Sequence, residues 1–218
     1  MLGLSSCFDK GGNIDNFPPT PAIVDFYSSF LQPKILTPHG TFFAPELTSA
    51  IGELNDGDAI IAQFSINYDQ QSPGSDFYTV SDIQGNWIKI DKSYPGTTPV
   101  GDFDIPIEKM GIFWGTGNVL FFLFQQTAPT DQKFVYEMTF DPENQKVVYI
   151  RAKKEGTASK PSDTFTYPFV FDMSNYYWRL PGYDKDVEFK IMYYTGKDGE
   201  DGFKEYEDNP VKVLLKAE

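Results

Sequence analysis

Residues that could assemble a catalytic site are scarce in this sequence. His39 is the only histidine and Cys7 the only cysteine, so a Ser-His-Asp or Cys-His mechanism would depend on one of them. His39 stands between Pro38 and Gly40, which are typical loop residues, so a solvated turn residue is the favoured interpretation. No serine stands in the Gly-x-Ser-x-Gly pattern of a nucleophile elbow. The sequence therefore predicts no catalytic residues.

Metal and cofactor sites are equally poorly supported. One histidine and one cysteine cannot build an ordinary zinc site. The acidic run at 198–202 (Asp-Gly-Glu-Asp-Gly) offers oxygen ligands of the kind calcium prefers, but its spacing departs from the EF-hand pattern. Asp and Gly also suit a hairpin turn, so a turn is favoured and calcium binding stays open. We expect no cofactor and no metal.

Aromatic residues supply the candidate binding site. Tyr176, Tyr177, Trp178 and Arg179 bring three rings and a guanidinium group together in four consecutive residues. Such a run cannot point every ring inward, and an exposed ring can stack on a sugar or anchor a protein partner. The alternative is that Tyr177 and Trp178 close one end of the core.

The segment around Cys7 indicates export and lipid attachment. Leu4-Ser5-Ser6-Cys7 matches the lipobox of bacterial lipoproteins, in which the cysteine is acylated after cleavage. The residues that follow, up to 21, are polar and rich in Gly and Pro, as a tether would be. We interpret 1–21 as a truncated signal with a lipobox and tether. The protein is expected on the bacterial outer membrane, on its periplasmic or surface side, anchored only by lipid.

Composition favours strands and argues against nucleic acid. The formal net charge of −13 repels phosphate backbones, so nucleic-acid binding is not expected. Aromatic residues make up 17% of the chain, and these residue types suit half-buried pleated surfaces. The sequence therefore predicts an all-β fold.

Hydrophobic alternation predicts the strands of the first half. It runs through 59–68 after the turn signal at 55–58, and shorter strands are predicted at 34–37, 77–83 and 87–90. The segment 22–31 fits a helix or a strand equally well. Short strands separated by polar turns predict a small barrel or sheet over residues 22–95.

The second half contains longer predicted strands. They cover 119–124, 134–140, 148–152, 165–171, 187–193 and 211–215, with a one-turn helix around 174–180. The turn at 141–145 joins two of them in a hairpin. These strands predict an antiparallel β-sandwich over residues 96–218.

Several segments resemble NigD-like lipoproteins of Bacteroides and its relatives. Residues 37–66, including Leu54-Asn55-Asp56-Gly57, resemble the first domain of that family. Residues 118–122 and 169–174 resemble its second domain. The resemblance implies a lipobox, an OB-type barrel and a C-terminal β-sandwich. The family offers no established activity and no functional residues to carry over, only an association of its name with bacteriocin gene clusters.

Together these observations predict a non-catalytic cell-envelope lipoprotein that binds an unknown ligand. The family name suggests a protein partner, such as a bacteriocin component. Surface glycan binding is the alternative. An enzymatic alternative is a β-fold glycosidase, because 31 acidic residues allow many carboxylate pairs.

Overall fold

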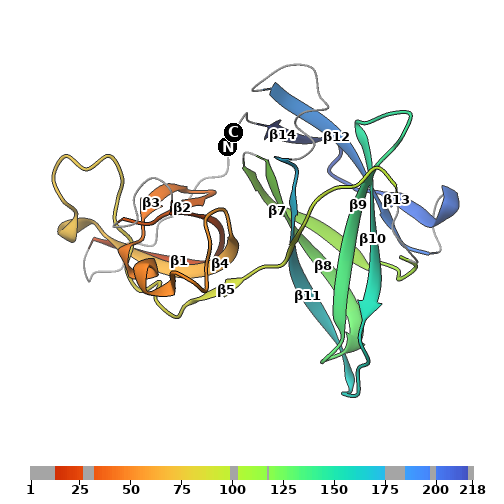
Figure 1. The fold of residues 1–218 in the computed structure, drawn as a ribbon, viewed down its shortest axis with the longest axis horizontal. Helices are drawn as coiled ribbons and strands as arrows, with labels where there is room; N and C mark the ends of the chain where they lie inside the picture. The colour runs from red at the N-terminus through yellow and green to blue at the C-terminus, as the bar shows by residue number, and fades with distance from the viewer. Residues whose placement is uncertain are drawn as a thin grey trace. The chain divides into compact units, whose positions relative to one another are not determined.

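The computed structural model describes residues 13–26, 32–98, 103–116, 118–174, 185–196 and 200–215. Across these residues it is built from strands and short 3-10 helices, which confirms the all-β class (Figure 1). The strands are β1 (Ile14–Asp25), β2 (Lys34–Thr37), β3 (Gly40–Phe43), β4 (Ala59–Asn67), β5 (Trp87–Lys89), β6 (Lys92–Ser93), β7 (Lys109–Thr116), β8 (Val119–Pro129), β9 (Lys133–Phe140), β10 (Val147–Glu155), β11 (Ser162–Asp172), β12 (Lys185–Tyr194), β13 (Phe203–Glu205) and β14 (Val211–Leu215). The 3-10 helices are η1 (Pro45–Ala50), η2 (Tyr68–Gln70) and η3 (Glu200–Gly202).

The chain divides between Ile90 and Asp91 into two compact units, here called unit 1 and unit 2. Each unit encloses its own hydrophobic core. The core of unit 1 draws on buried residues between Ala22 and Ile83, and the core of unit 2 on residues between Ile107 and Val213. The division lies close to the boundary expected at residue 95.

Unit 1 is a small barrel. Its sheet has the order β3-β2-β1-β4-β5, with antiparallel neighbours throughout. The segment after Tyr78 connects β3 to β4, because Thr79 bridges Phe43 and Ser81 bridges Ser65. The main chains of Ser65 and Ser81 exchange two hydrogen bonds of 2.9 Å. This closure gives the small barrel that the short strands predict, in the OB-like form that the resemblance implies.

Two segments of unit 1 differ from the prediction. Residues 77–83 are not a strand but a run of isolated bridges, because they pair first with β3 and then with β4, and Asp82 turns the chain at φ 62°. Residues 14–21 form the first part of β1 instead of a tether. A register shift between Phe17 and Thr20 accommodates two of the three prolines of this strand, which cannot donate to a ladder. The ambiguous segment that follows is strand as far as Asp25.

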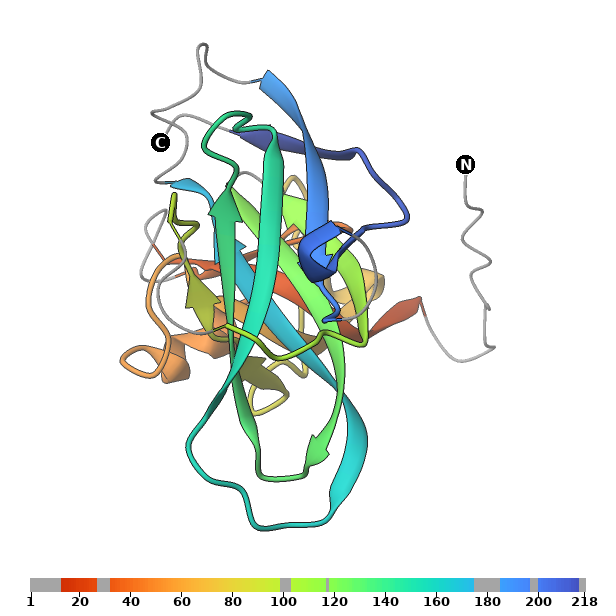
Figure 2. The same ribbon diagram turned by 90° about the vertical axis from the view of Figure 1, so that its right-hand side faces the viewer.

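Unit 2 is a sandwich of two sheets. One sheet has the order β6-β11-β8-β7, and the other the order β13-β12-β10-β9, with β14 paired to β12. Figure 2 shows the β9–β10 hairpin in front of β8 and β11. Alternate side chains such as Phe122, Phe171 and Ile150 fill the space between the sheets and are 0% exposed. The predicted sandwich is thereby confirmed.

Two pairings in unit 2 are parallel, in contrast to the antiparallel expectation. β10 runs parallel to β12, and β6 runs parallel to the end of β11. Alternation fixes which side chains face inward but not the direction of a neighbouring strand, so the sequence pattern could not predict this.

The helix predicted around 174–180 falls almost wholly outside the described residues. Within the described ranges, no helix has the length and apolar character needed to cross a membrane.

Candidate functional site

The residues predicted from sequence as functional are mostly not placed by the structure. Cys7 and the run Tyr176, Tyr177, Trp178 and Arg179 lie outside the described residues. Their predicted roles, lipid attachment and ligand binding, therefore remain predictions.

His39 lies in the turn between β2 and β3 and is exposed, as expected of a loop residue. Its main-chain N–H donates to Thr37 Oγ1 over 3.1 Å, and its ring lies 5.1 Å from the ring of Phe17. Among the described residues, no hydrogen bond joins its imidazole to a serine or an acid. The geometry gives no sign of a triad.

The acidic loop is described only from Glu200, where η3 leads into β13. Asp201 has a positive φ of 56°, which suits the turn interpretation. Within the described part of the chain, no group of three or more His, Cys, Asp or Glu side chains could hold a metal ion. Asp198 and Gly199 lie outside that part.

A cluster of rings around one arginine forms on the outer face of the sheet β13-β12-β10-β9. The guanidinium carbon of Arg151 lies 4.7 Å from the ring centre of Phe203 and 5.6 Å from that of Tyr149. Phe203 also packs edge-on against Tyr149 at 5.0 Å and Tyr194 at 5.5 Å. We call Tyr149, Arg151, Tyr194 and Phe203 the Arg151 cluster. Its side chains are half-buried.

Strand register produces this cluster. On β10, Ile150 and Ala152 point into the core and are 0% exposed, so the alternate residues Tyr149 and Arg151 face outward. Tyr194 on β12 is paired directly with Phe203 on β13, so their side chains share that face.

The turn between β12 and β13 sets the position of Phe203. The carbonyl of Gly202 accepts hydrogen bonds from the N–H groups of Thr195, at 2.8 Å, and Gly196, at 3.2 Å. Gly202 itself has a φ of +80°, and a Cβ there would meet the Tyr194 ring at 2.8 Å. A glycine is therefore required where the chain enters β13.

Electrostatics keep Arg151 in place as a cation. Its Nη1 donates to Thr139 Oγ1 over 2.8 Å. Burial lowers the pKa of Arg151, while the nearby charges of Glu137 and Tyr149 raise it. An arginine begins from so high a pKa that it stays protonated under these conditions. The cluster thus presents a fixed positive charge among aromatic rings. The guanidinium group does not transfer protons at neutral pH, but a cation among aromatic rings suits the binding of a partner.

A cavity in unit 2 bears on the glycosidase alternative. It has a volume of about 220 Å³, and the residues that line it are Glu108, Lys109, Met110, Tyr193, Lys204, Tyr206 and Glu207. Two carboxylates therefore share one hollow, as a glycosidase requires. However, Thr127 donates its main-chain N–H to Glu108 Oε1 at 2.9 Å and its hydroxyl to Glu108 Oε2 at 3.0 Å. Both carboxylate oxygens thus hold β8 in place, which suits a structural role better than proton transfer.

Sequence reasoning missed the Arg151 cluster because its members stand far apart in the chain. The alternation at 148–152 indicates that Tyr149 and Arg151 share a face. The parallel pairing of β12 with β10 is needed to bring Tyr194 and Phe203 onto the same face, and no local pattern encodes it.

Comparison with known proteins gives a fold and no closer relationship. No family model matches the chain, and no curated protein matches it significantly. Solved structures do match over nearly the whole length. A NigD-like immunity protein from Bacteroides caccae ATCC 43185 has a TM-score of 0.53 and 12% identity, covering 94% of this chain and 99% of that one. The resemblance to NigD-like proteins is therefore confirmed for the fold.

Two further structures share this fold. A protein of unknown function, DUF1344, from Bacteroides vulgatus ATCC 8482 has a TM-score of 0.57 and 13% identity, with 94% of this chain and 92% of that chain covered. A putative toxin-related protein from Parabacteroides distasonis ATCC 8503 has a TM-score of 0.56 and 12% identity, with 94% of each chain covered. At such low identity, the likeness concerns the arrangement of strands.

Proposed function

We propose that this chain is a non-catalytic binding protein of the bacterial cell envelope and that its partner is a protein. The observation that carries the proposal is the Arg151 cluster on the outer face of the sheet in unit 2. Arginine and aromatic side chains dominate the binding energy of protein interfaces. The fold shared with a NigD-like immunity protein and a toxin-related protein supports a toxin or bacteriocin component as the class of partner.

The geometry of the rings favours a protein over a glycan. A sugar-binding platform needs coplanar rings with open faces. In the Arg151 cluster the rings of Tyr149 and Phe203 are inclined at 73°, and those of Tyr194 and Phe203 at 63°. One face of Phe203 is occupied by the guanidinium group of Arg151. Such a corner suits a shaped protein surface better than a flat sugar ring.

Envelope attachment through Cys7 is part of the proposal. Its support is the Leu-Ser-Ser-Cys sequence and the polar residues that follow it, of which 8–13 precede β1. A Cys7→Ser variant made in the native host should leave the membrane fraction, and the N-terminal peptide of the wild type should carry acyl chains in mass spectrometry. An unmodified Cys7 in membrane-bound protein would contradict lipid attachment.

Affinity capture from the native envelope tests the binding function. Wild type, Arg151→Gln and the control Lys154→Gln would be compared, because Lys154 is an exposed neighbour on β10. Loss of a hot-spot residue costs about 2 kcal/mol or more, hence roughly 30-fold in affinity. We expect a protein that is retained by wild type and the control and lost with Arg151→Gln. Equal retention by all three folded proteins would refute a role for the Arg151 cluster.

A further inference from the structure

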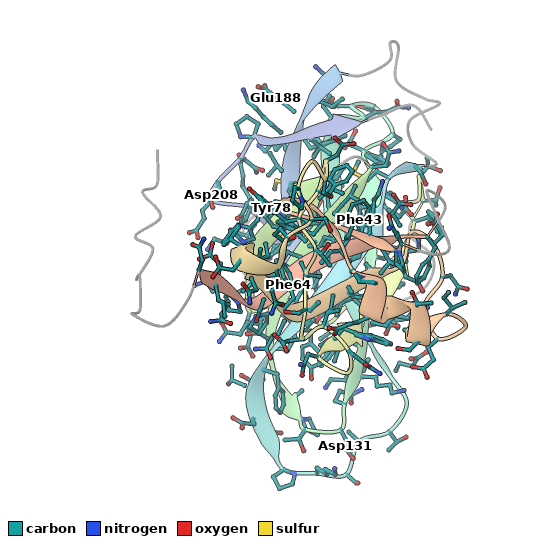
Figure 3. All side chains as sticks on the ribbon, turned by 90° about the vertical axis from the view of Figure 1, so that its left-hand side faces the viewer. Phe43, Phe64, Tyr78, Asp131, Glu188 and Asp208 are labelled. Carbon is teal, nitrogen blue, oxygen red and sulfur yellow. The ribbon has the colours of Figure 1, made fainter. Side chains whose placement is uncertain are left out.

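Two tyrosines form an exposed corner on unit 1. The rings of Tyr68 and Tyr78 lie 5.1 Å apart at an interplanar angle of 87°. Tyr78 is 51% exposed, which is unusual for so large a side chain in a defined ring contact. Figure 3 labels Tyr78 beside Phe43, whose main-chain N–H donates to the carbonyl of Tyr78 over 2.9 Å. The corner therefore lies on the loop that closes the barrel.

A glutamine clamps that loop. The Nε2 atom of Gln71 donates to the carbonyl of Asn67 at 2.7 Å and to that of Thr79 at 3.1 Å. Its Oε1 accepts from the N–H of Thr79 at 2.7 Å. Because Asn67 precedes Tyr68 and Thr79 follows Tyr78, one side chain joins the two backbone segments that carry the rings. The corner is thus built before any ligand arrives, which reduces the entropy cost of binding.

A carboxylate completes the corner. The Tyr68 hydroxyl donates to Asp15 Oδ2 over 2.8 Å, which brings the start of β1 to the rings. Burial, and then the hydrogen bond and charge of Asp15, raise the pKa of Tyr68 to about 12. The phenol therefore stays protonated at neutral pH and leaves the negative charge on Asp15. Aromatic rings and a carboxylate are the elements that attract an organic cation.

Unit 1 has few cations of its own to occupy the corner. Residues 1–90 contain ten acidic residues, three lysines and no arginine. Lys89 is paired with Asp58 at 2.6 Å, and Lys34 lies over the Phe77 ring at 4.7 Å. No lysine or arginine of the described residues lies over Tyr68 or Tyr78. The charge of this unit thus complements a basic partner.

We infer that Tyr68, Tyr78 and Asp15 form a recognition site for a lysine or arginine side chain on a basic segment of a protein partner. The cation would lie against the exposed part of the Tyr78 ring with Asp15 as its counter-charge. The excess of acidic residues in unit 1 would draw the basic segment toward this unit. The site lies on a different unit from the Arg151 cluster, so it can fail while the proposed function holds, and the reverse.

Calorimetric titration of the full chain with an acetylated, amidated hexalysine peptide tests this inference. At fixed ionic strength, Tyr78→Leu should bind about 2- to 30-fold more weakly than wild type, from a cation–π energy of about 0.5–2 kcal/mol. Tyr78→Phe keeps the ring and should bind like wild type. Tyr94→Leu is the control, because Tyr94 is similarly exposed, at 49%, on unit 2. Asp15→Asn should also weaken binding.

Three outcomes would overturn the site. If Tyr78→Leu and wild type bound the peptide with equal affinity, the binding would come from the overall charge of the unit and not from the site. If wild type did not bind hexalysine, the inference of a basic partner would be wrong. If tetramethylammonium chloride bound as tightly as the peptide, the corner would be a site for a small cation and not for a protein segment. Circular dichroism of each variant confirms that the barrel is folded before titration.

Discussion

The phenol of Tyr136 is 2% exposed and its ring stacks on Phe124 at a centroid distance of 4.0 Å. Its hydroxyl has no hydrogen-bond partner among the described residues. The amide of Gln126 is close enough to affect the pKa of Tyr136 but lacks hydrogen-bond geometry, and its Nε2 is also unsatisfied. A buried polar group without a partner costs free energy. Tyr136 therefore contributes through its ring alone.

Removing that hydroxyl should stabilise unit 2. We expect Tyr136→Phe to raise the free energy of unfolding by about 1–2 kcal/mol in urea denaturation, because a desolvated hydroxyl is deleted and the stacking stays. Tyr206→Phe is the matched control and should destabilise, since the Tyr206 hydroxyl donates to Asp208 Oδ2 at 3.0 Å. A loss of stability in Tyr136→Phe would show that its hydroxyl is satisfied.

Alkaline pH should destabilise the fold through Tyr136 and Tyr68. Burial raises the pKa of Tyr136 above the ordinary 10, and the pKa of Tyr68 is raised to about 12. Above about pH 10 the unfolded chain loses these protons while the folded chain keeps them, so the free energy of unfolding falls as pH rises. Urea denaturation at pH 8, 10 and 11 should show this decline, and Tyr136→Phe should reduce it. A slope identical in wild type and variant would contradict the assignment to Tyr136.

At the scale of single elements, the β12–β13 turn depends on a glycine. Gly202→Ala combines a φ of +80° with a Cβ 2.8 Å from the Tyr194 ring, so about 2–3 kcal/mol of unfolding free energy should be lost. Gly156→Ala is the control. Its φ is +72° but its Cβ would meet nothing within 4 Å, so only about 1–2 kcal/mol should be lost. Thermal unfolding of both variants measures the difference, and equal losses would mean that Tyr194 is free to move.

The sequence predicts best those elements whose evidence is local. Alternation identifies β4, and the turn at 141–145 identifies the β9–β10 hairpin, because both depend on neighbouring residues. The sequence pattern does not predict β3 and β7, because their residues include glycines and alternate only weakly between apolar and polar side chains. The bridging segment at 79–81 depends on two distant strands. Long-range pairing, which also assembles the Arg151 cluster, could not be predicted from local pattern.

At the scale of the whole molecule, the two hydrophobic cores should support separate folding. The buried residues of the unit 2 core begin at Ile107, and none of them comes from unit 1. A fragment of residues 91–218 should therefore unfold in one cooperative thermal transition, matching one of the transitions of the full chain. A fragment without near-ultraviolet circular dichroism would show that unit 2 needs unit 1.

Site-specific photocrosslinking in the native host tests whether the chain binds a protein through the outer face of unit 2. The photoreactive residue p-benzoylphenylalanine would replace Tyr194 and, as control, exposed Tyr94. We predict one discrete protein adduct from position 194 that is absent from position 94 and is lost when Arg151→Gln is added. No adduct at position 194, or the same adduct from both positions, would contradict the claim.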